Sequence, residues 1–385
     1  MAGSKLSVLR KPKRRLILDS RESPINIGHA TTFGKHWFLL FNDIFVHAGY
    51  ASHATHHLQT VWIESHQTAS AASTASPTSH SSKTFNNSET KDLEITLVMP
   101  EETLVLVANN HETKNDWILN LQRYIIETLG SASDHKYKSY TPPILRNTSY
   151  AFNKVPELKG AEYNGAWLHG KLHGHGKLSW HDGRSYQGQF RQNQKHGMGK
   201  MEIPGTNGKI TILDGQWKCG KLDGQANIWF ANGDIYHGLV KDGKPHGQGL
   251  MKQGRFMNSE ASVYIGEWSL ALKSGYGVLD DIKAGEKYMG MWSNDMKNGQ
   301  GCVVTFDGLY YEGIFCQNKM SGRGLMLFED ETMYEGQFAD TGVFNGVGVL
   351  TYPNGDKLEG SFYGNYGKGM KFNGTIYRYD FIFIK

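Results

Sequence analysis

The chain has 385 residues, and its 41 lysines and arginines only slightly outnumber its 37 aspartates and glutamates. Hydrophobic residues make up 39% of the sequence, which is enough for two or three domains with packed cores. Its apolar runs fall far short of the ~18 residues that a membrane-spanning helix requires, and we expect no signal peptide. With neither a long basic run nor a base-stacking pattern, the sequence also argues against nucleic-acid binding.

Short strands are the first predicted elements. Runs of β-branched and aromatic residues predict strands at residues 16–18, 36–47, 58–63, 93–99 and 103–108, with a hairpin turn at 100–102. Residues 66–91 are rich in Ser, Thr, Ala and Asn and cannot bury enough apolar surface to fold. We expect them to be a disordered insertion.

A helix is predicted after the last of these strands. Asn109 and Glu112 form a capping-box pattern, and Trp117, Leu121 and Ile125 recur every four residues, so the helix ends near residues 129–130. Antiparallel strands closed by one amphipathic helix that carries a tryptophan resemble a pleckstrin homology domain. The resemblance implies a pleckstrin homology-like β-barrel with a C-terminal helix over residues 15–130.

Domains of this kind bind phosphoinositides through basic residues around their first two strands, where phosphate oxygens meet arginine and lysine. Residues 1–14 form a basic arm before the first strand. Specific headgroup recognition, diffuse attraction to anionic lipid and a protein-binding or structural role all stay open. The lipid-binding candidates are Lys11, Lys13, Arg14, Arg15, Arg21 and Lys35.

Residues 131–158 are predicted to be a partly extended linker, on which Tyr140, Tyr150 and Phe152 are placed to pack against the segment that follows. From Tyr163 to about Gly369 the chain repeats Tyr-x-Gly-x-Trp/Phe, followed by Gly-x-Gly, with a period near 23 residues. Such self-similarity predicts a stacked array. The copies begin at Tyr163, Tyr186, Leu213, Tyr236, Tyr264, Tyr288, Tyr311 and Tyr334, with a degenerate ninth at Leu358.

Each copy predicts a β-hairpin, and the whole array predicts a mainly β fold in one long meander. Alternate residues share a strand face, so two rings flank a bare glycine, and we expect the ring of a neighbouring repeat to cross that gap. The residues predicted to pack the repeats are Tyr163, Gly165, Trp167, Tyr264, Gly266, Trp268, Tyr288, Gly290, Trp292, Tyr311 and Gly313.

The repeated Tyr-x-Gly-x-Trp/Phe sequence resembles the MORN motif. This resemblance implies an elongated single-layer array of hairpins over residues 159–369, eight repeats plus the degenerate ninth, with residues 370–385 as a C-terminal strand or tail. The charged turn residues have two possible roles. They can simply be solvated, or they can orient the array on anionic lipid or on an acidic partner. Turns between repeats are acidic, whereas turns within repeats place a basic edge at Lys171, Lys195, Lys221, Lys244, Lys273, Lys297 and Lys319.

Catalytic and metal-binding patterns are weak. His169, His173 and His175 lie close together in a turn and a strand, and His53, His56 and His57 fall in a polar stretch, neither with ligand spacing. Cys219, Cys302 and Cys316 share no register and are expected to be free thiols. No nucleophile and base constellation stands out, so we expect no enzyme activity, no cofactor and no metal.

A pleckstrin-type domain followed directly by MORN repeats resembles the middle of the alsin and alsin C-terminal-like family. The resemblance implies a noncatalytic membrane-targeting and assembly module of a guanine nucleotide exchange factor, cytoplasmic and peripherally associated with endosomal membranes. Implied partners are small GTPases of Rab and Rho/Rac type through the full-length protein, anionic phospholipid and a second copy of the chain. The alternative is a stand-alone MORN-repeat scaffold that tethers membranes or cytoskeletal partners. Whether the chain is a fragment or a short relative stays open.

Overall fold

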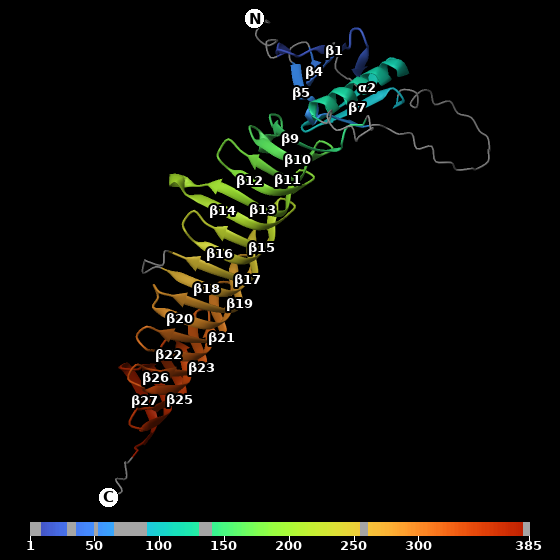
Figure 1. Cartoon of the computed structure of the whole chain (residues 1–385). Coiled ribbons are helices and arrows are strands. Elements are labelled where there is room, and N and C mark those ends of the chain that lie inside the picture. The colour runs from blue at the N-terminus through green and yellow to red at the C-terminus, as the bar shows by residue number, and fades with distance from the viewer. Residues whose placement is uncertain are drawn as a thin grey trace, which may run out of the picture. The chain divides into compact units, whose positions relative to one another are not determined.

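The computed structural model describes residues 9–28, 36–49, 53–64, 91–130, 141–254 and 261–379 (Figure 1). It divides into two compact units: an N-terminal unit, Met1–His181 with Gln189–Gln194, and a C-terminal unit, Asp182–Gly188 with Lys195–Lys385. The division therefore falls inside the repeats and not in the predicted linker. Lys35, residues 1–8 of the basic arm, residues 66–90 of the predicted insertion and residues 380–385 lie outside the described residues.

The first domain of the N-terminal unit consists of short strands and a helix, α2 (His111–Thr128). The expected barrel takes the form of two four-stranded antiparallel sheets, in the orders β1-β3-β4-β5 and β2-β8-β7-β6. Both sheets and α2 share one core, in which Phe38, Leu97 and Trp117 are fully buried. The strands are β1 (Leu16–Asp19), β2 (Ile25–Ile27), β3 (Trp37–Phe41), β4 (Ile44–Ala48), β5 (His53–His57), β6 (Trp62–Glu64), β7 (Glu94–Met99) and β8 (Glu102–Ala108).

The strand pattern predicted for this domain was wrong in four places. The run at 36–47 is two paired strands, because the chain turns at residues 42–43 between β3 and β4. The polar histidine stretch is strand β5, which forms one edge of its sheet, where alternate residues face solvent. Residues 58–63 begin with a 3₁₀ turn at Leu58–Thr60 before β6, and β2 was not predicted at all.

Helix α2 starts one residue later than the capping box predicted. Its N-cap is Asn110, whose side-chain oxygen accepts a hydrogen bond from the Thr113 amide at 2.8 Å. The predicted apolar face is confirmed, because Trp117, Leu121 and Ile125 are all fully buried. The Trp117 indole donates to the Ser23 carbonyl at 3.0 Å, which satisfies its one polar atom.

The predicted linker contains a strand. β9 (Leu145–Ala151) pairs antiparallel with β10 (Glu162–Leu168), which also pairs with β11 (Lys171–Ser179). The rings of Tyr150 and Phe152 pack against Trp167, with centroids 5.9 and 6.1 Å away. Both aromatic side chains thus contact the first repeat, as predicted, and Tyr140 lies outside the described residues.

The C-terminal unit is a long antiparallel hairpin sheet, in which each strand from β13 to β27 pairs with the next. β12 (Ser185–Arg191) is divided between the two units. The degenerate ninth repeat also forms a hairpin, β26–β27. The strands are β13 (Gln194–Pro204), β14 (Ile210–Lys218), β15 (Lys221–Trp229), β16 (Ile235–Lys241), β17 (Lys244–Gln253), β18 (Ser262–Ser269), β19 (Leu272–Asp281), β20 (Glu286–Ser293), β21 (Met296–Thr305), β22 (Tyr310–Cys316), β23 (Lys319–Leu327), β24 (Met333–Asp340), β25 (Val343–Thr351), β26 (Lys357–Asn365) and β27 (Lys368–Tyr377).

Glycine makes room for the tyrosine of its own repeat and not, as predicted, for that of a neighbour. A Cβ on Gly290 would lie 2.6 Å from the Tyr288 hydroxyl and 2.5 Å from the Cα of Gly301 on the paired strand. The Tyr288 hydroxyl donates to the Met291 carbonyl at 2.8 Å. Its ring also meets Phe315 of the next repeat edge to face, with centroids 5.1 Å apart.

Two-residue turns with left-handed backbone connect the two strands of most repeats. Asn294 and Asp295 have φ values of 50° and 65°, and Leu270 and Ala271 have 51° and 74°. Positive φ at both positions defines the type I′ turn, whose twist suits a hairpin. The turn of one repeat also bonds the previous repeat, since the Asp295 amide donates to the Lys273 carbonyl at 3.1 Å.

Ala271→Gly should stabilise the chain by ~1 kcal/mol, because alanine at this φ is strained and glycine is not. The urea midpoint of the full chain measures this. Gly243→Ala is the matched control: its φ is 82° and an added Cβ would meet nothing within 4 Å, so it should destabilise through the backbone alone. Unchanged midpoints in both variants would contradict the turn assignment.

Gly290→Ala should cost about 2–3 kcal/mol, because the new methyl group meets backbone atoms of the paired strand that cannot move aside. The adjacent change Met291→Ala, on an exposed side chain, should alter stability by less than ~0.5 kcal/mol. Thermal unfolding of the two variants side by side tests the difference, and equal losses would rule out the close-approach explanation.

Candidate binding surfaces

The seven predicted edge lysines belong to two classes that differ by one residue of register. Lys195, Lys273 and Lys297 lie nine residues after the first residue of their repeat, whereas the other four lie eight residues after it. Because side chains alternate along a strand, this one-residue difference reverses the face. The Trp268↔Lys273 and Trp292↔Lys297 pairings place the ninth residue on the aromatic face.

The three inward lysines cover aromatic rings. The Lys273 ammonium lies 5.4 Å from the Tyr264 ring centroid and 5.0 Å from that of Trp292 in the next repeat. Burial lowers the pKa of Lys195 to about 8, and its ammonium lies 4.6 Å from the Trp217 centroid. These lysines support packing inside the C-terminal unit and do not form a free basic edge, so this part of the prediction was wrong.

The outward lysines gather at the third and fourth repeats. Lys221 and Lys244 are exposed, and each is paired across the turn with a second exposed lysine, in the pairs Lys218↔Lys221 and Lys241↔Lys244. Only Lys221 has a carboxylate partner within the described part of the chain, Asp242 at 3.4 Å. We call these four residues the lysine cluster.

Sequence reasoning missed Lys218 and Lys241, although both end a strand three residues before a predicted edge lysine. The Lys-x-x-Lys spacing across a two-residue turn could have identified both lysines from the sequence. Like charges directly opposite each other in a sheet destabilise it, so their pairing in two adjacent repeats is unusual for structure alone. Of the other outward lysines, Lys319 pairs with Asp340 at 2.6 Å, and Lys171 of the N-terminal unit is exposed.

Two of the arginines predicted to bind lipid in the first domain form ion pairs with carboxylates of the same domain. The Arg14 side chain is 3% exposed and forms a two-point contact with Asp43, its Nε lying 2.6 Å from Oδ1. Arg21 pairs with Asp19, and this hydrogen bond holds the pKa of Asp19 below its usual value. Arg21 is exposed although it is paired, and the exposed candidates without a carboxylate partner among the described residues are Lys11, Lys13 and Arg15.

A carboxylate clamp joins the first domain to β9 and the loop after it within the N-terminal unit. Glu101, in the turn between β7 and β8, accepts hydrogen bonds from the backbone amides of Asn153, Lys154 and Val155 at 2.7 to 3.1 Å. It also accepts one from the Tyr150 hydroxyl at 2.9 Å. These donors hold the pKa of Glu101 below its usual value despite its partial burial.

Arg146 on β9 forms a second connection. Its guanidinium is 4% exposed and donates to the carbonyl oxygens of Val61 at 2.7 Å, Gln59 at 3.2 Å and Pro143 at 2.8 Å. Its central carbon lies 4.6 Å from the Trp62 ring centroid. Burial lowers the pKa of Arg146 to about 10. In place of a carboxylate, the three carbonyl oxygens accept its hydrogen bonds and offset the cost of burying the charge. The first domain is therefore tied by buried polar contacts to β9, which pairs with strand β10 of the first repeat.

No three His, Cys, Asp or Glu side chains group as metal ligands would within the described ranges. The His169 Nε2 atom lies instead 3.4 Å from a carboxylate oxygen of Glu64. Cys219 and Cys316 are exposed free thiols, and Cys302 is half-buried. No helix within these ranges is both long and apolar enough to cross a bilayer.

Comparison with known proteins agrees with this architecture. Residues 1–131 match the model of the alsin PH-like domain. MORN repeats match at residues 163–183, 186–205, 214–235, 236–252, 264–281, 288–310, 311–333 and 334–357, eight segments that leave the ninth hairpin unmatched.

Three curated proteins are similar in sequence to this chain over half of its length or more. Alsin of Homo sapiens is 40% identical over 384 residues, which is 98% of this chain and 22% of alsin. The alsin homolog of Drosophila melanogaster is 29% identical over 76% of this chain and 17% of its own length. The ALS2 C-terminal-like protein of Bos taurus is 30% identical over 51% of this chain and 18% of its own length. The chain thus spans about a fifth of the length of these relatives.

The fold and these matches define a class: a PH-like domain followed by MORN repeats, both noncatalytic kinds of domain. Within that class, the chain belongs to the alsin family.

Acid should weaken the clamp region through Glu102, which pairs with His56 and Lys154. Its hydrogen bond with His56, followed by that with Lys154, lowers its pKa from 4.5 to about 2. A lowered folded-state pKa gives stability that is complete above pH 4.5 and is lost as the pH falls toward 2. Glu102→Gln should therefore be less stable than the parent at neutral pH, and the gap should close with acid.

Urea unfolding across this pH range measures the gap. Glu94→Gln on the neighbouring strand β7 is the control and should keep the parent's pH profile. A Glu102→Gln profile parallel to that of the parent would show that this carboxylate contributes nothing to acid sensitivity.

Proposed function

We propose that this region is the noncatalytic membrane-targeting and assembly module of an alsin-like guanine nucleotide exchange factor. The exchange factor acts on small GTPases of Rab and Rho/Rac type in the cytoplasm, at endosomal membranes. The GTPases and the compartment are inferred from the resemblance to alsin, whose remaining length lies outside this chain's alignment. The chain itself contributes no catalytic step, no cofactor and no metal.

The lysine cluster is the observation that carries the membrane part of this proposal. Lys218, Lys241 and Lys244 are exposed and have no carboxylate partner within the described chain, while the inward lysines are occupied by rings. Lysines near an anionic bilayer each contribute ~1 kcal/mol to binding. Lys11, Lys13 and Arg15 of the first domain supply a second weak attraction.

The clamp supports the assembly part. Because Glu101 and Arg146 tie the first domain to β9 and the loop after it, the first repeat and the PH-like domain form one compact unit. Binding through either element therefore also holds the other near the membrane.

Vesicle co-sedimentation of the full chain tests the membrane proposal, with phosphatidylcholine vesicles compared with vesicles that also contain phosphatidylserine or phosphoinositides. We expect binding only to anionic vesicles and loss of binding at high salt. The variant Lys218→Gln, Lys241→Gln, Lys244→Gln should weaken binding by at least about tenfold.

The control changes the same amount of charge elsewhere, with Lys357→Gln, Lys368→Gln and Lys371→Gln near the C-terminal end of the described chain. Equal weakening by both triple variants would show that net charge, and not the cluster, drives binding. Absence of binding by the parent would refute the targeting role and favour the MORN-repeat scaffold.

A further inference from the structure

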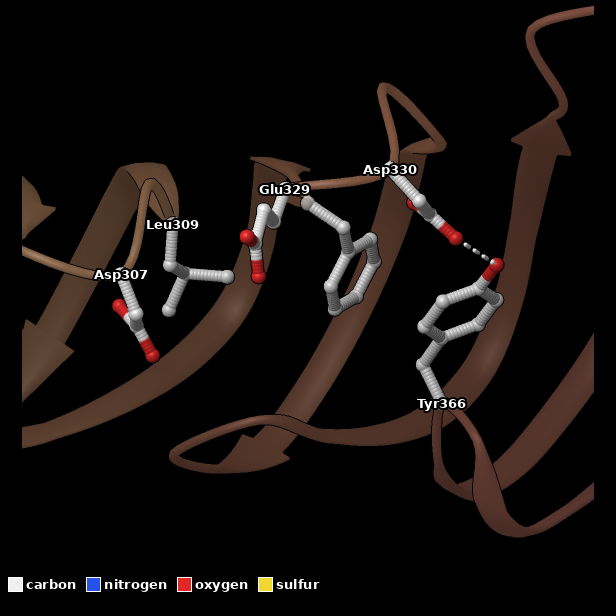
Figure 2. Close-up of a pocket in the computed structure, with 6 residues that line it drawn as sticks. Asp307, Leu309, Glu329, Asp330 and Tyr366 are labelled. Atoms are coloured by element: carbon white, nitrogen blue, oxygen red, sulfur yellow. Dashed lines mark hydrogen bonds between the residues drawn. The ribbon is translucent and has the colours of Figure 1, made fainter.

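An open hollow lies between turns of the C-terminal unit, near the end of the repeats. It encloses about 560 Å³ and is lined by Asp307, Leu309, Phe328, Glu329, Asp330 and Tyr366 (Figure 2). Asp307 and Leu309 come from the turn between β21 and β22, residues 328–330 from the turn between β23 and β24, and Tyr366 from the turn of the ninth hairpin. Three turns of the array therefore contribute to one site.

The ninth hairpin reaches this hollow because its turn meets the loop between two earlier repeats. The rings of Tyr366 and Phe328 lie 4.3 Å apart between centroids at an interplanar angle of 31°. The Tyr366 hydroxyl donates to Asp330 at 2.8 Å, a contact that Figure 2 shows, and its oxygen lies 3.1 Å from the Thr332 hydroxyl, from which it can accept. One wall of the hollow is thus a pair of half-exposed aromatic rings, held in place by hydrogen bonds.

The other wall is acidic. Asp307, Glu329 and Asp330 are exposed and have no cationic side-chain partner within residues 261–379. Hydrogen bonds from Tyr366 and Thr332 hold the pKa of Asp330 below its usual value, and the Thr305 hydroxyl does the same for Asp307. Asp307 and Asp330 are therefore charged at neutral pH and are partly fixed in direction before any ligand arrives.

We propose that this hollow binds an arginine side chain from a basic segment of a partner protein. A planar guanidinium stacks on an aromatic ring while its fork of N–H donors reaches carboxylates, and the hollow offers both surfaces together. A divalent cation fits less well, because these carboxylates do not converge as a group of metal ligands. Lysine has a compact ammonium that cannot stack and donate in a fork at once.

This interaction is separate from membrane targeting. The hollow is acidic and would repel an anionic bilayer, so the lysine cluster and the hollow select partners of opposite charge. A protein bound at the hollow need not compete with lipid at the cluster, and the failure of either proposal leaves the other standing.

Peptide titration against the full chain tests the proposal by fluorescence anisotropy. The probe is a labelled peptide of alternating arginine and glycine, and its counterparts replace arginine with lysine or with citrulline, which is planar but neutral. We expect the arginine peptide to bind several-fold more tightly than the lysine peptide, and the citrulline peptide not to bind.

Glu329→Gln is the first variant, because no hydrogen bond or ion pair of the fold uses this side chain in the described chain. It should weaken arginine-peptide binding several-fold without changing the melting temperature. Glu359→Gln removes the same charge from an exposed position on β26 that does not line the hollow, and should leave binding unchanged. Tyr366→Ala should remove the preference for arginine over lysine.

Three results would overturn the proposal. Equal affinity for arginine and lysine peptides, unaffected by Tyr366→Ala, would show only general attraction to negative charge. Equal weakening by Glu329→Gln and Glu359→Gln would place binding elsewhere. Displacement of the peptide by calcium chloride, but not by sodium chloride of the same ionic strength, would identify a cation site instead.

Discussion

The repeats depend on one tyrosine that lies across two glycines. Its ring covers the glycine that follows it by two residues and the glycine opposite on the paired strand, as Tyr288 does over Gly290 and Gly301. Its hydroxyl donates a hydrogen bond to the carbonyl three residues later, and its ring makes an edge-to-face contact with an aromatic ring of the next repeat. Burial raises the pKa of Tyr311 to about 12, so the ring stays neutral. Strand pairing, hairpin shape and repeat stacking therefore all depend on this one side chain.

A one-residue change in register decides what each lysine does. At the ninth position, Lys273 and Lys297 occupy the inward site that Leu172 and Met320 fill in other repeats. The long side chain keeps apolar contact along its stem while its ammonium lies over the rings. At the eighth position the same residue type faces outward. Because side chains alternate between the two faces of a strand, lysines at the ninth position pack inside the repeats and lysines at the eighth position face solvent. The two classes cannot be told apart when the basic residues of the turns are only counted.

The sequence was sufficient for the class of the fold, because the Tyr-x-Gly-x-Trp/Phe period and the tryptophan of α2 are local patterns. It was also sufficient for the number of repeats and for the exposed, outward position of Lys221 and Lys244. It was insufficient where tertiary partners decide the outcome. Arg14 is taken up by Asp43, which lies 29 residues away in sequence, and the hollow needs Tyr366 to meet Asp330, 36 residues away. Contacts of this kind leave no periodic signal.

β9 also determines where the chain can be divided without harm. It occupies the side of β10 that would otherwise be a free strand edge, with pairing along all seven residues of β10. Cutting after residue 158, where composition suggests a domain boundary, would leave the first repeat with exposed N–H and C=O groups that attract strands of other molecules. The same cut would leave Arg146 attached to the first domain with its apolar neighbour Trp167 removed. Aggregation of separated halves would thus reflect a severed sheet and not an unstable repeat.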